Sequence, residues 1–117
     1  MAAALASAVG VGHSYLGERF ILTRLFRRAD LPALFGSDVF TKRTLRFAWH
    51  LTSIAWWGSA ALFVVLSRGS VRQGVQVLSI MFFASALVAL VASRGRHLVW
   101  ILFAAIAAAA WMGMPKT

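Results

Sequence analysis

Four side chains with metal-binding or proton-binding chemistry lie within or beside long apolar stretches of this chain. They are one glutamate and three histidines, at positions His13, Glu18, His50 and His97. Imidazole and carboxylate groups are common ligands of divalent transition metals. Two histidines can also hold a haem iron, and a Glu–His pair can pass a proton. These residue types therefore predict a binding site for a metal, a haem or a proton.

Glu18 and His50 have different neighbours in the sequence, and these neighbours indicate their roles. Glu18 lies in an otherwise apolar segment, where a salt bridge with Arg19, Arg46 or another base is the structural alternative to a ligand role. His50 follows Arg46 by one helical turn, and a hydroxyl and an indole follow His50 at three and seven residues, on the same helix face. We therefore predict a ligand or proton site formed by Glu18, His50, His13, Ser53 and Trp57.

The partner of His50 depends on which arginine marks the inner end of the first apolar stretch. If Arg24 marks it, Glu18 lies about 9 Å deeper along a helix, level with His50. If Arg19 instead reaches out to the interface, His13 lies about 9 Å deep and becomes the level partner. Both alternatives remain open at this stage. The candidate metal ligands are His13, Glu18, His50 and His97, with haem or a divalent transition metal as the cofactor.

Recognisable catalytic and cofactor motifs are absent from the sequence. The chain has no cysteine, which excludes thiolate metal sites and disulfides. It has no His-x-x-x-His or Glu-x-x-His spacing and no glycine-rich nucleotide motif, so any cofactor site must be assembled in three dimensions. The sequence thus indicates binding rather than catalysis, and we assign no catalytic residue.

The composition indicates that lipid surrounds most of the chain. Hydrophobic residues make up 61% and charged residues only 13%, whereas soluble domains contain roughly 25% charged residues. A helix that crosses a bilayer needs about 20 residues, and no apolar run alternates with the period of a strand. We therefore predict an all-α, integral membrane four-helix bundle in a single domain. Its spans cover about residues 2–26, 47–66, 75–92 and 98–114, with an interfacial loop at 27–46.

The connections between the spans predict alternating helix directions. Pro32 and Gly36 break helix in the long connection, and Ser37 or Asp38 is a suitable N-cap for a helix that begins before its span enters lipid. Two later connections, at about 67–74 and 93–97, are short enough only for tight turns. Helices two to four should therefore run up, down and up.

The basic residues predict the orientation. The chain has 12 Lys and Arg against 3 Asp and Glu, a net charge of +9, but the bases sit at the ends of apolar runs and form no face for nucleic acid. Nine of them fall on the side of the long loop and three on the other. We expect both termini outside, the long first loop in the cytoplasm, and a bacterial inner (plasma) membrane. Lipid headgroups or a partner should contact Lys42, Arg43 and Arg46. An aromatic belt at the interfaces should contain Trp49, Trp100 and Trp111.

The small residues predict close helix contacts, within the bundle or with another chain. They recur at fours in two rows, Ala4, Ala8 and Gly12, and Ser85, Ala89 and Ser93. The expected partners are the bilayer and, through these rows, other membrane subunits or a second copy of the chain. The main functional hypothesis is a small membrane protein with a buried Glu/His site. The alternatives are an accessory or assembly subunit of a larger membrane complex, and a proton-coupled small transporter that uses Glu18.

Overall fold

The computed structural model describes residues 1–115, whose regular elements are all helices, with no β-strand. The elements are α1 (Ala2–Leu16), η1 (Gly17–Leu22), α2 (Thr23–Leu25), α3 (Val39–Ser67), α4 (Val71–Ser93) and α5 (Val99–Met112). Helical backbone angles at Leu16 and Leu22 join α1, η1 and α2 into one rod, so the described chain forms four rods. The all-helical class and the four helices are thus confirmed.

Two of the rods are long and apolar enough to cross a membrane, namely α3 with 29 residues and α4 with 23. At 1.5 Å per residue, the rod from Ala2 to Leu25 extends about 36 Å. The apolar helix α5 has only 14 residues, about 21 Å, which is less than the roughly 30 Å of a bilayer core. The rods therefore differ in the depth of membrane that they could span.

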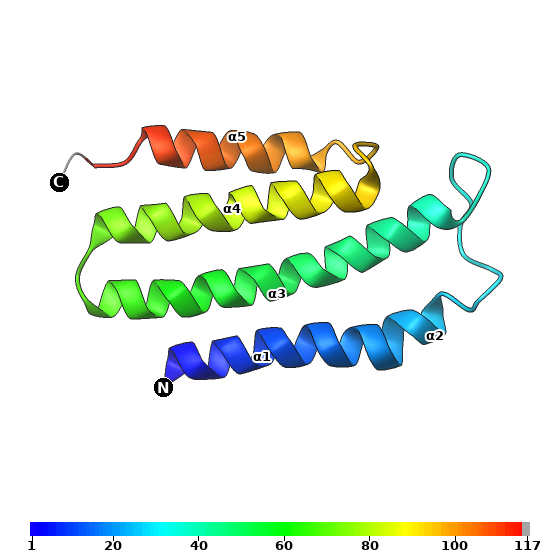
Figure 1. Ribbon diagram of the computed structural model, residues 1–117, viewed down its shortest axis with the longest axis horizontal. Coiled ribbons are helices and arrows are strands. Elements are labelled where there is room, and N and C mark those ends of the chain that lie inside the picture. The colour runs from blue at the N-terminus through cyan, green and yellow to red at the C-terminus, as the bar shows by residue number, and fades with distance from the viewer. Residues whose placement is uncertain (116–117) are drawn as a thin grey trace.

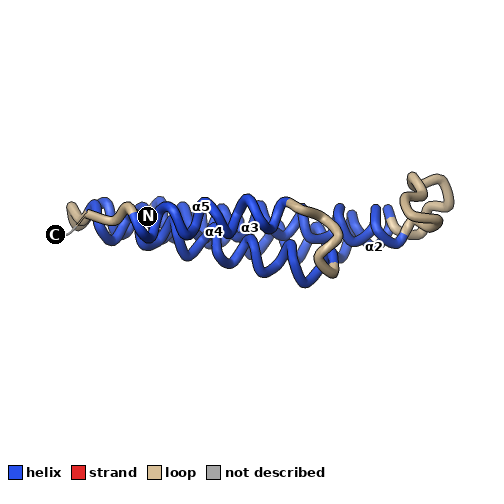
Figure 2. The backbone as a smooth tube through the Cα atoms, turned by 90° about the horizontal axis from the view of Figure 1, so that it is seen from above, coloured by secondary structure: helices blue, strands red, loops and turns tan. Residues whose placement is uncertain are grey.

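The rods lie side by side in a single layer, in the order α1, α3, α4, α5 (Figure 1). The layer measures 53 × 31 × 14 Å and appears thin when seen edge-on (Figure 2). Among the described residues each rod contacts only its neighbours along the chain, so α1 does not reach α4 or α5. This differs from the closed bundle expected from the sequence. Hydropathy could not decide between the two, because lipid and a neighbouring helix are equally apolar surroundings.

The long loop is shorter than the expected 27–46, because α3 begins at Val39. Lys42, Arg43 and Arg46 therefore lie on the first turns of α3 rather than in a loop. The breaks at Pro32 and at Gly36, which has a φ of +84°, fall within the loop as predicted. Asp38 occupies the N-cap position, but its side chain pairs with Lys42 at 2.6 Å and caps no amide.

The chain reverses at each connection, and the start of α1 and the end of α5 lie at the same end of the layer (Figure 1). The loop before α3 and the link between α4 and α5 lie at the opposite end. Small residues fill the contacts between rods, and the row Ser85, Ala89 and Ser93 is buried there. By contrast, space is open around Gly12, so the two predicted small-residue rows have different surroundings.

Candidate functional site

The candidate site lies between α1/η1 and the first half of α3, where the chain departs from α-helical geometry. Residues Gly17–Leu22 form a π-helical turn, with the wider bonding pattern that often occurs at functional sites. The Thr23 hydroxyl donates to the carbonyl of Arg19 at 2.6 Å, within this turn. Glu18 is the second residue of the turn, so its direction relative to α3 depends on this local change in pitch.

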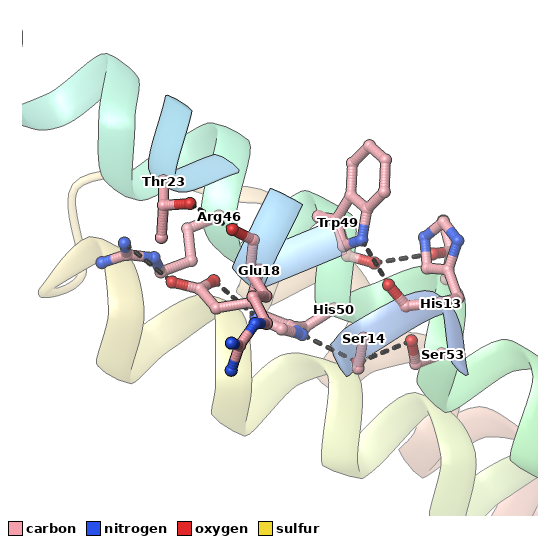
Figure 3. Close-up of polar contacts among 10 residues, drawn as sticks. His13, Ser14, Glu18, Thr23, Arg46, Trp49, His50 and Ser53 are labelled. Atoms are coloured by element: carbon pink, nitrogen blue, oxygen red, sulfur yellow. Dashed lines mark hydrogen bonds and ion pairs between the residues drawn. The ribbon is translucent and has the colours of Figure 1, made fainter. Parts of the chain in front are cut away.

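Glu18 contacts two bases on α3 (Figure 3). Its Oε1 lies 2.9 Å from Nη2 of Arg46, and its Oε2 lies 3.3 Å from Nε2 of His50. The side chains of Glu18 and His50 are 36% and 34% exposed. The site is therefore half-buried. The salt bridge considered for Glu18 is present with Arg46, and the same carboxylate also reaches the histidine.

The second ring nitrogen of His50 continues this contact into the layer. Its Nδ1 lies 2.8 Å from Oγ of Ser14, and Oγ of Ser14 lies 2.7 Å from Oγ of Ser53, so each pair is within hydrogen-bond distance (Figure 3). Ser53 is only 1% exposed. Glu18, His50, Ser14 and Ser53 thus form one continuous chain of hydrogen bonds from the half-exposed carboxylate to a buried hydroxyl.

His13 takes part in packing beside this chain rather than in it. Its ring stacks on the indole of Trp49, with centroids 4.5 Å apart and planes 6° apart, and its carbonyl accepts from Nε1 of Trp49 at 2.9 Å. A Cβ atom on Gly17 would overlap that same indole, so the close approach requires glycine. Trp49 therefore packs between helices, and its place in an interfacial belt stays a prediction. Of the two registers considered, the structure pairs Glu18, not His13, with His50.

The remaining predicted site residues lie apart from the Glu18–His50 contact. Trp57 packs over Gly10, where a Cβ would come within 2.6 Å of its Nε1, and it makes no hydrogen bond to the chain of polar groups. His97 packs against Phe40 and Phe47 on the other side of α3. Residues 1–115 contain no group of three or more His, Asp or Glu side chains that could hold a metal ion. The four predicted metal ligands are thus not brought together.

The three bases expected to contact headgroups have different partners. Lys42 is paired with Asp38, and Arg46 with Glu18. Arg43 instead lines a pocket at the end of the layer. Asp30 pairs with Arg28 in the loop, and the hydrogen bond from that guanidinium lowers the pKa of Asp30. Every acidic side chain of the protein thus has a basic partner.

Sequence reasoning did not identify Ser14, although a signal was available. Ser14 precedes Glu18 by four residues, so both side chains occupy one face of a helix and could have been read together. The π-helical turn had no comparable signal in the sequence; it begins at Gly17, the residue that packs against Trp49 of α3. Comparison with models of protein families, with curated proteins and with solved structures finds no match for this chain.

Proposed function

We propose that this chain is an integral membrane protein that binds a proton at the Glu18–His50 contact. The membrane assignment is supported by α3 and α4, in whose most apolar windows only 17% and 22% of the residues are buried. The apolar side chains of these helices thus face outward, which lipid tolerates and water does not. The excess of bases at the loop end supports a cytoplasmic position for that end, with both termini outside in a bacterial inner membrane.

A proton suits this site better than a metal ion because of how the ligands are already engaged. Both ring nitrogens of His50 have hydrogen-bond partners, and both oxygens of Glu18 face a base. A metal ion would have to displace one of these contacts and would find only two ligating side chains. A haem would need the two sides of its iron facing separate imidazoles, whereas the ring of His13 is stacked on Trp49.

The hydrogen-bond chain carries the proposal. Its hydrogen bonds can run in two directions, and the site holds one more proton in one direction than in the other. If Ser53 donates to Ser14 and Ser14 donates to Nδ1 of His50, then Nε2–H donates to an ionised Glu18. If Ser14 instead donates to Ser53, Nδ1–H of His50 must donate to Ser14, which leaves Nε2 of a neutral His50 without a proton. The contact between that Nε2 and Oε2 of Glu18 then requires a second proton on one of these two atoms. Uptake of one proton at the half-exposed end is thereby linked to reversal of two hydroxyl groups inside the layer.

The test is NMR of the ¹⁵N-histidine, ¹³C-glutamate labelled protein in lipid nanodiscs across a pH series. Assignment is direct, because the chain has one glutamate and three histidines. We expect both His50 nitrogens and the Glu18 carboxyl carbon to change together in one step. Glu18→Gln should abolish the joint change. His97→Asn, which alters a histidine outside the chain of polar groups, is the matched control and should preserve it.

Other outcomes would favour the alternative functions. If His50 titrates independently of the Glu18 carboxyl and Glu18→Gln leaves its signals unchanged, the proton-site proposal is wrong. A larger membrane complex that forms equally well with the Glu18→Gln variant would then support an accessory subunit. If the joint change occurs, proton flux into liposomes loaded with a pH-sensitive dye distinguishes a coupled transporter from a static site.

A further inference from the structure

A polar pocket lies at the loop end of the layer, on the far side of α3 from Glu18. It has a volume of about 220 Å³ and lies between the loop before α3, the first turn of α3 and the link from α4 to α5. Arg43, Arg94 and Arg96 line it, together with the hydroxyl-bearing residues Ser37 and Ser93. Three arginine residues from two separate segments thus line one small cavity.

No acidic side chain lines this pocket. The nearest one in sequence, Asp38, is paired with Lys42, while Asp30 is paired with Arg28 and Glu18 with Arg46. Within residues 1–115 the three pocket arginines therefore have no carboxylate partner. Like charges gathered around one cavity repel one another, and an anion bound between them would replace that repulsion with attraction.

The backbone holds these arginines in place. Arg94 ends α4 in the left-handed conformation, with a φ of +52°, and the Gly95 amide donates back to the carbonyl of Leu90 at 2.9 Å. Such a conformation is strained for a residue other than glycine. If only the stability of the fold mattered, glycine would therefore be better than arginine at position 94. The guanidinium of Arg96 lies over the ring of Phe35, 6.0 Å from its centroid, which ties Arg96 to the loop before α3.

The start of α3 lies at the same cavity. Val39 and Phe40, the first residues of this 29-residue helix, line the pocket, and the Asp38 side chain caps none of the first amides. Amides at a helix N-terminus favour an anion. Arginine forks match the oxygens of a phosphate group in paired hydrogen bonds. The volume is below the roughly 300–1,000 Å³ of pockets that enclose a whole small molecule, and so it fits a single headgroup-sized anion.

From this arrangement we infer that the pocket formed by Arg43, Arg94 and Arg96 binds a phosphate group, carried either by an anionic phospholipid or by a soluble phosphate. This inference is independent of the proton site, because Arg46 is already held by Glu18. It also changes the expected set of headgroup-binding bases from Lys42, Arg43 and Arg46 to the three pocket arginines.

The experiment uses the full chain in two arms. In the first, native mass spectrometry counts phospholipids retained by protein released from nanodiscs that contain equal amounts of phosphatidylcholine and phosphatidic acid. In the second, inorganic phosphate is titrated into protein in pure phosphatidylcholine nanodiscs and followed by calorimetry. The variants are Arg43→Gln, Arg96→Gln and Arg94→Gly. Arg94→Gly removes the charge and relieves the left-handed strain, so a loss of binding in it does not come from misfolding.

We expect each pocket variant to weaken binding about tenfold or more, as for loss of a charged hydrogen bond. Arg68→Gln, at the opposite end of the layer, should bind as the wild type does. Retained phosphatidic acid without calorimetric phosphate binding identifies a lipid headgroup as the source, and phosphate binding in neutral lipid identifies a soluble anion. No binding in either arm, or equal losses with Arg68→Gln and the pocket variants, overturns the inference.

Discussion

The contact between Gly17 and Trp49 is the tightest point between α1/η1 and α3, and it makes a sharp prediction. A methyl group at position 17 would overlap the indole ring. That ring cannot move without disturbing its hydrogen bond to the His13 carbonyl and its stack on the His13 ring. We therefore expect Gly17→Ala to destabilise the protein and to misplace Glu18, the next residue along the chain.

The magnitude follows from three contributions. Overpacking typically costs about 1–3 kcal/mol, the hydrogen bond contributes about 1 kcal/mol, and the stacked pair about 0.5–1.5 kcal/mol. If the ring shifts, only part of the hydrogen-bond and stacking energy is lost. Alanine also stabilises the helix by up to about 1 kcal/mol relative to glycine, because its helix propensity is better. The expected net loss in the free energy of unfolding is about 2–3 kcal/mol.

Gly12→Ala is the matched control, because it makes the same substitution five residues earlier with nothing within 4 Å of the added methyl group. It should leave the free energy of unfolding unchanged or raise it by up to about 1 kcal/mol. Both variants are measured by equilibrium unfolding in mixed micelles with sodium dodecyl sulfate, followed by far-UV circular dichroism. Trp49→Phe removes the overlapping atoms, so the double variant should recover at least about 1 kcal/mol of the loss. Equal unfolding midpoints for Gly17→Ala and Gly12→Ala would refute the reasoning.

Three further predictions use the same unfolding assay. Ser79→Ala removes a 2.7 Å hydrogen bond to a carbonyl of α5 and should lower the free energy of unfolding by about 0.5–1.5 kcal/mol. Ser59→Ala removes a hydrogen bond within its own helix and should have almost no effect. A larger loss with Ser59→Ala than with Ser79→Ala would contradict the role of Ser79 in joining α4 to α5. Ser53→Ala deletes a buried hydroxyl at the end of the proton chain and should cost about 1 kcal/mol, together with loss of the joint pH response of His50 in NMR. Asp30→Asn should leave stability at neutral pH unchanged, because its pair with Arg28 is fully exposed. The hydrogen bond from Arg28 lowers the pKa of Asp30. Any stability that the pair contributes is therefore present at neutral pH and is lost as the pH falls through that pKa. A clear difference in stability between Asp30→Asn and the wild type at neutral pH would contradict the prediction that the exposed pair contributes little.

The elements of the fold could be predicted from the sequence because each depends on local composition. Long apolar runs gave four helices, and Pro32 and Gly36 gave the break between the first two. The chain runs in alternate directions because its later connections are short. The orientation in a membrane remains a prediction from charge.

The arrangement of the helices depends instead on pairs of residues far apart in the sequence. Gly10 faces Trp57 and Gly17 faces Trp49, so two glycines and two tryptophans set how far α1 slides along α3. The distribution of apolar side chains around a helix cannot identify such pairs when both lipid and protein surround that helix. For the same reason Glu18 could be named from its chemistry, but whether Glu18 or His13 is the partner of His50 could not be decided without the packing of Gly17 against Trp49.

The single layer also explains why the Glu18–His50 contact is half-exposed rather than sealed. α1 is an edge rod with α3 as its one neighbour among the described rods, so no third described rod packs against the contact between α1/η1 and α3. A closed bundle would have surrounded this group and raised the desolvation penalty of its charged form. In the layer, Arg46 and His50 each contact one oxygen of the carboxylate, which stays partly exposed, and the more deeply placed part of the network, Ser14 and Ser53, is uncharged. The arrangement therefore places the charged groups at the exposed part of the contact and a neutral hydroxyl group, that of Ser53, in the buried part.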